Sequence, residues 1–189
     1  MSGKLSGLCL ALLLTAGAAV IDRVAVVVGT TVITETEVLQ EARLEAFLNQ
    51  SKLDLGPEQR KAAAERLVDQ QLVRNEMSVG SYPKPAEAEV EDMLRRLRQE
   101  QFGGEAQYRE ALTKYGVTED QVKNYLMWQL AAIRFTDLRF GATDSKQQSA
   151  NRAKSDSAVP ANDVDQQLDA WLKEARTTVK VKFRPEAFQ

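Results

Sequence analysis

The sequence contains no histidine among its 189 residues, and this absence removes many kinds of catalytic and metal site. Ser-His-Asp and Cys-His nucleophile systems, zinc sites with histidine ligands and imidazole acid-base catalysis all require that side chain. The chain also has no Walker loop and no G-x-G-x-x-G motif for nucleotide phosphates. We therefore expect no catalytic residue, no metal site and no cofactor, and we predict that the protein is not an enzyme.

Cysteine occurs once, as Cys9, inside an apolar amino-terminal segment. Lys4 precedes this segment, Leu5 to Leu14 form its apolar core, and Ala16-Gly17-Ala18 supplies small residues for cleavage. This order is typical of a secretory signal peptide, and the core is short for a membrane span. We predict that residues 1–18 are a signal peptide removed on export. Lipid attachment at Cys9 is the alternative, which the bulky preceding residue disfavours.

Basic residues are not in excess, since 25 Lys and Arg stand against 27 Asp and Glu. Cleavage after residue 18 leaves 24 basic and 27 acidic residues and no thiol. This charge balance provides no electrostatic footprint for nucleic acid, and an oxidising compartment does not harm a chain without cysteine. We expect a periplasmic protein that binds neither nucleic acid nor nucleotide.

The segment after the predicted signal reads as a β-hairpin that leads into a helix. Valine and isoleucine dominate residues 21–28 and 31–33, and these side chains fit a pleated sheet. Gly29 can supply the positive φ that the first position of a two-residue type II′ turn needs. Thr34 lies three residues before Glu37, the spacing of a capping box, which predicts that a helix begins there.

Helical periodicity then covers the chain to about residue 140. It predicts helices over about 34–49, from 57 to about 77, between 85 and 102, over 105–115 with Gly116 as the carboxyl-terminal cap, and from Thr118 onward. The last of these is apolar on two faces, one containing Tyr125 and the other Trp128 and Phe135. Such a helix is buried on both faces, which is the commoner arrangement, or leaves apolar surface for a ligand.

Polar residues dominate from 141 to 162, which predicts a flexible linker. Beyond it, residues 164–175 repeat at helical spacing and residues 179–183 alternate as in a half-buried strand. An isolated helix and strand are unstable, so we predict that residues 163–189 complete the helical domain of residues 19–140. The expected fold is mostly α with a small β-sheet, in which the carboxyl-terminal strand pairs with the amino-terminal one. Such a linker also permits a domain-swapped homodimer.

The order and spacing of several segments resemble the amino-terminal domain of SurA-type periplasmic chaperones and their PrsA and PpiD relatives. These segments are 21–38, 66–72, 108–116 and 118–121, and residues 168–188 are similar to the helix and strand that close that domain. In that family the helical domain binds unfolded polypeptide, especially precursors of outer-membrane proteins. Parvulin-type prolyl isomerase modules usually precede the closing segment. They typically use histidines and need about a hundred residues, so this chain lacks them.

The resemblance implies an ATP-independent holdase that binds unfolded chains through apolar surface. Methionine and aromatic side chains suit such a surface because they adapt to varied partners, although core packing is the commoner role of large apolar residues at helical spacing. The candidate client-binding residues are Met77, Tyr82, Met93, Phe102, Tyr125, Met127, Trp128 and Phe135, among which we select Trp128, Phe135 and Met93 first. The alternatives are residual prolyl isomerase activity and an adaptor that docks one dedicated envelope partner.

Overall fold

A computed structural model of the chain describes residues 22–80, 82–141 and 162–189. These residues form a mostly helical protein with one three-stranded antiparallel sheet, as predicted. The predicted signal peptide and nearly all of the predicted linker lie outside the described residues.

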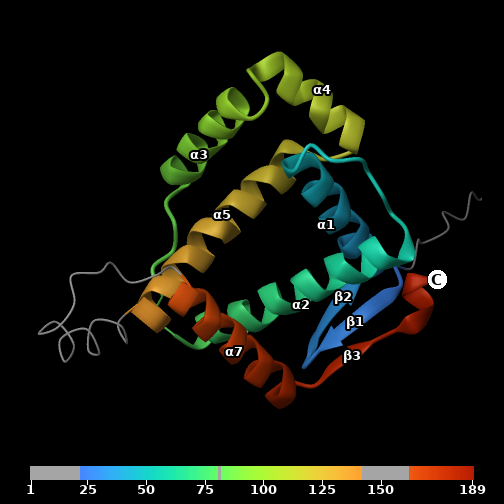
Figure 1. Cartoon of the computed structure of the whole chain (residues 1–189), viewed down its shortest axis with the longest axis vertical. Helices are drawn as coiled ribbons and strands as arrows, with labels where there is room; N and C mark the ends of the chain where they lie inside the picture. Colours follow the sequence, from blue (N-terminus) through green and yellow to red (C-terminus); the bar gives the residue numbers. More distant parts are fainter. Residues whose placement is uncertain (1–21, 81, 142–161) are drawn as a thin grey trace, which may run out of the picture.

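Three helices form the sides of a triangle, and the other elements pack around it (Figure 1). They are α1 (Glu35–Leu48), α2 (Pro57–Val79) and α5 (Glu119–Thr136). Hydrogen bonds between residues close in sequence determine where two of these helices, α1 and α5, begin. The Thr34 hydroxyl accepts a hydrogen bond from the Glu37 backbone N–H at 3.3 Å, and the Glu37 carboxylate accepts one from the Thr34 N–H at 2.7 Å. Thr118 starts α5 with the same predicted capping box.

The sheet joins the two ends of the described chain. Its central strand β1 (Val24–Val28) lies between β2 (Thr31–Thr34) and β3 (Val181–Phe183). A two-residue turn connects β1 to β2, and Gly29 adopts a φ of 61° there, as the predicted turn requires. β3 pairs antiparallel with β1. The predicted pairing of the amino- and carboxyl-terminal strands is therefore confirmed.

Two further helices lie outside the triangle, one alongside α5 and the other near the corner where α1 meets α5 (Figure 1), and both contribute to the packing at this corner. They are α3 (Glu87–Glu100) and α4 (Glu105–Tyr115), and α4 ends at Gly116 with a φ of 65°, as predicted for a left-handed cap. A π-helical turn, η1 (Asp137–Gly141), follows α5 directly. The triangle is thus supported at this corner by two helices that do not form its sides.

The last described segment lies along α2 and ends beside the sheet. It contains α7 (Asn162–Thr178), β3 and a final turn η2 (Pro185–Phe188). Two arginines attach it. Arg176 of α7 donates to the Asp69 carboxylate at 2.9 Å and to the Glu65 carboxylate at 2.5 Å. Arg60 of α2 donates to the carbonyl oxygen of Ala187 at 3.0 Å. The predicted helix and strand are therefore fixed to the same body as the amino-terminal hairpin.

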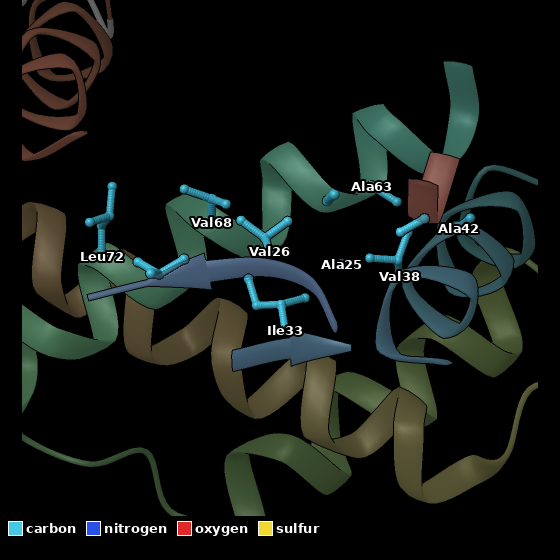
Figure 2. Packing of buried hydrophobic residues seen from close by; sticks show 11 residues of the cluster. Ala25, Val26, Ile33, Val38, Ala42, Ala63, Val68 and Leu72 are labelled. Carbon is cyan, nitrogen blue, oxygen red and sulfur yellow. The ribbon is translucent and has the colours of Figure 1, made fainter. Parts of the chain in front are cut away.

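Among the described residues, the buried hydrophobic side chains form three clusters near the corners of the triangle, the first of which also extends along α2. The first joins the sheet to α1 and α2. Figure 2 shows Val68 and Leu72 of α2 facing Val26 of β1, with Val38 of α1 at one end. The second cluster joins α1, α3, α4 and α5, and the third joins the ends of α2 and α5 to η1 and α7. Each side of the triangle is thus held near both of its ends.

Candidate functional site

Two hollows are lined by all three sides of the triangle and border the second and third clusters. The larger has a volume of about 1040 Å³ and the smaller a volume of about 510 Å³. Five residues line both hollows, and together they come from all three helices: Glu41, Leu44, Gln70, Tyr125 and Trp128. We call these five residues the junction, because the two hollows meet there.

The remaining lining residues show that the hollows open toward different sides of the triangle. On α2 the smaller hollow is lined by Arg66 and Asp69, whereas the larger is lined by Leu67, Arg74 and Met77. At 3.6 residues per turn, these two sets lie on helix faces rotated by roughly 100° from each other. A polypeptide segment that covers the junction can therefore extend into either hollow.

Two aromatic side chains from α5 form one wall of the junction. Trp128 is half-buried, and the guanidinium carbon of Arg74 lies 4.8 Å from the centroid of its ring, which is a cation–π geometry. The Tyr125 hydroxyl accepts a hydrogen bond from the Gln129 side-chain amide at 2.8 Å. Burial raises the pKa of Tyr125, so the phenol is neutral at physiological pH. This wall offers apolar area with a few polar groups at its edge.

Glu41 of α1 provides a largely enclosed carboxylate at the junction, since its side chain is only 11% exposed. Its Oε1 atom lies 3.4 Å from Nε of Arg66, and the same guanidinium also pairs with Glu45. Two carboxylates therefore share one cation. Burial raises the pKa of the Glu41 carboxyl, and the positive charges of Arg66 and Arg74 oppose that rise.

Glu41→Gln is expected to remove one component of the pH dependence of stability. The folded state binds a proton at Glu41 more tightly than the unfolded state does, because the pKa of this carboxyl is raised in the folded protein. The contribution of Glu41 to the free energy of unfolding therefore falls as pH rises from the ordinary pKa through the raised one. Urea titrations across this acidic range should show the wild type losing stability relative to the variant as pH increases. Parallel curves would contradict this assignment.

Five of the predicted client-binding residues come together at the hollows. Tyr125 and Trp128 belong to the junction, and Met127 lines the larger hollow. Met77 and Tyr82, which the sequence also identified, line the larger hollow as well. The structure thus gathers five of the eight candidates around one opening, and their role in client binding stays a prediction.

The other three candidates lie away from the hollows. Met93 and Phe102 are half-buried against the second cluster, where the Phe102 ring stacks on Phe47 with 4.8 Å between centroids. Phe135 is fully buried in the third cluster, at 0% exposure. The expectation that Phe135 offers surface to a client does not agree with this burial. The reason is that the end of α5 extends beyond the open part of the triangle, where α7 covers it.

Sequence reasoning missed the contribution of α1 to the site and all of that of α2 except Met77. Glu41, Leu44, Glu45 and Leu48 line the smaller hollow from α1, and they follow the i, i+3, i+4, i+7 spacing of one helix face. This face mixes acidic and apolar residues, so neither a hydrophobic stripe nor a charged surface stood out. The position of Gln70 and Arg74 opposite α5 depends on how the three helices cross, which has no short-range signal.

Two further properties of the described ranges bear on the kind of site. None of the helices within them has the length and apolar character of a membrane span. The same ranges contain no group of three or more His, Cys, Asp or Glu residues placed to hold a metal ion.

No protein-family model matches the chain, and no curated protein matches it.

Proposed function

We propose that the protein is an ATP-independent holdase chaperone that binds unfolded polypeptide across the two hollows. The observation that carries this proposal is the junction, where Tyr125 and Trp128 face a space bounded by three helices that pack mainly near their ends. An unfolded chain exposes apolar and aromatic side chains, and burying them against such walls stabilises the complex by about 25 cal/mol per Å² of apolar surface.

The lining of the larger hollow suits clients of varied sequence. Met77 and Met127 are flexible and polarisable, so they can fit side chains of different shapes. Gln70, Gln121 and Asn124 each carry amide donors and acceptors that can pair with the backbone of an extended segment. Apolar contact together with backbone hydrogen bonds gives binding that does not depend on a fixed sequence.

The proposed location is the periplasm, where precursors of outer-membrane proteins would be the clients. The amino-terminal residues have the order of a secretory signal peptide, and the segments that resemble SurA-type chaperones support the same assignment. The resemblance is carried by segments in β1, α2, α4 and α5 together with the closing α7 and β3.

Aggregation of a denatured outer-membrane protein, followed by light scattering, tests the proposed function. The wild type should suppress aggregation, and Trp128→Ala should require about tenfold more protein for the same effect, because loss of a central aromatic contact costs about 1 to 2 kcal/mol. Leu138→Ala is the matched control, since Leu138 is 55% exposed but lines neither hollow.

The pattern of results separates the proposed function from its alternatives. A folded wild-type protein that fails to suppress aggregation of several unrelated clients would contradict the holdase. Suppression confined to a single partner would favour the adaptor. The protein would instead be an isomerase if it accelerated proline isomerisation in a model peptide and if this acceleration disappeared when the protein was depleted from the sample.

A further inference from the structure

We propose that the junction selects client segments that carry an arginine or lysine beside apolar residues, with Trp128 and Glu41 as the groups that recognise the cation. This inference rests on the proposed function and specifies its client class. It follows from a cation that the protein already holds at this position and from the balance of charges around it.

The first observation is that Arg74 already occupies a cation position at the junction. It reaches from α2 across to the Trp128 ring of α5, with 4.8 Å between its guanidinium carbon and the ring centroid. The Glu41 carboxylate acts on the same guanidinium through its charge. An aromatic face and a carboxylate are the two groups that commonly recognise such a cation in proteins. Arg74 thus shows within this molecule how a client arginine can be held.

The second observation is a surplus of negative charge on the side of the smaller hollow. Its charged lining consists of Glu41, Glu45 and Asp69 against a single cation, Arg66. Asp69 is paired with Arg176 of α7, so Glu41 and Glu45 are left to share Arg66. A cationic side chain of the client that enters here can pair with Glu41 or Glu45, because these two carboxylates share one arginine, Arg66.

The third observation concerns the Glu41 carboxylate itself. Its Oε1 atom accepts a hydrogen bond from Arg66 at 3.4 Å, which is long for a charged pair. Within the described part of the chain, its Oε2 atom has no hydrogen-bond partner. Glu41 lines both hollows, so its carboxylate group borders the space that a client enters from either one.

Exchange of one cation for another makes the recognition reversible. Arg74 is an exposed residue on a long flexible side chain, so it can leave the Trp128 ring without disturbing the helices. A client arginine or lysine then takes its place against the ring while neighbouring apolar side chains fill the hollows. Removal of Arg74 should therefore strengthen binding of basic segments, whereas removal of the Glu41 charge should weaken it.

Fluorescence anisotropy with matched peptides tests this inference on the full-length protein. The probe is a labelled apolar peptide of about ten residues with one central arginine, and its partner carries citrulline, which keeps the shape without the charge. We expect the wild type to bind the arginine peptide about fivefold more tightly, as a single cation–π contact allows. Glu41→Gln should reduce this preference, because only the Trp128 ring then recognises the cation, and Arg74→Ala should increase it.

The controls separate recognition from a change in fold. Burial makes the charged form of Glu41 costly, so its glutamine variant is expected to fold, and its melting curve checks this. Glu110→Gln on α4 removes an exposed carboxylate that lines neither hollow and should leave the preference unchanged. Arg74→Ala provides a second, independent readout at an exposed residue.

Failure of this inference can be distinguished from failure of the proposed function. Equal binding of the arginine and citrulline peptides by the wild type would overturn the cation preference and leave client binding in place. The same holds if Glu41→Gln keeps the full preference. Absence of binding to either peptide would overturn the inference, and combined with unsuppressed aggregation it would also overturn the holdase.

Discussion

Deletion of residues 162–189 should unfold the protein or lower its free energy of unfolding by more than about 5 kcal/mol. The deletion removes β3 from one side of β1 and takes α7 and η2 away from α2. The first cluster loses Ala187 and the half-buried Phe183, and the third loses Trp171 and Leu172. Apolar surface that these residues cover becomes exposed, which a protein of ordinary stability does not survive.

Circular dichroism during urea or thermal unfolding measures this effect. Lys173→Ala is the matched control, because Lys173 lies on the exposed face of α7, and its substitution should change stability by less than about 0.5 kcal/mol. A truncated protein that melts like the wild type would show that the closing segment is dispensable. It would also mean that the three helices of the triangle keep their arrangement without α7.

The parts of the fold that the sequence predicts are those with a local physical cause. Thr34 and Thr118 each satisfy backbone N–H groups of the helix that follows, so the start of that helix is specified within four residues. Gly29 and Gly116 adopt positive φ values that glycine tolerates without strain. The pairing of β3 with β1 was predictable for a different reason, since neither strand is stable alone and few other partners exist.

The identity of the site residues depends on contacts that no local pattern encodes. Trp128 and Phe135 are seven residues apart and so lie on nearly the same face of α5. Trp128 reaches the hollows, whereas Phe135 is covered by Trp171 of α7, which is distant in sequence. Periodicity identifies such a face as apolar but cannot say which part of it a later helix covers. The same limit hid Glu41, whose neighbours come from two other helices.

The separation of the packing into three corners has a consequence for how this protein tolerates change. Core residues such as Phe47 of α1 and Val68 of α2 join the helices to their neighbours, while the junction lies at the edge of the second and third clusters. Apart from Leu44, which belongs to the second cluster, junction residues are not part of the buried core, so their substitution should alter binding more than stability. Substitutions at the corners should do the opposite, because they create cavities in close-packed regions.

Phe135→Ala should be the most damaging single substitution on α5, lowering the free energy of unfolding by about 3 to 5 kcal/mol. The ring is completely enclosed. Its centroid lies 5.3 Å from that of Tyr82, 5.5 Å from that of Trp171 and 5.9 Å from that of Phe140. These contacts join α5 to α7, to η1 and to the segment after α2. Truncation therefore leaves a cavity at a corner on which three elements depend.

Leu138→Ala, just beyond the end of α5, provides the comparison. Leu138 is 55% exposed and lines neither hollow, and its loss should cost less than about 1 kcal/mol. Urea titrations of both variants, combined with aggregation suppression at a temperature where each is folded, separate stability from binding. We expect Phe135→Ala to suppress aggregation normally while it remains folded, since the ring does not reach the hollows. If instead this variant were as stable as the wild type and lost client binding, Phe135 would be a client contact, and the corner would have to open for the protein to work.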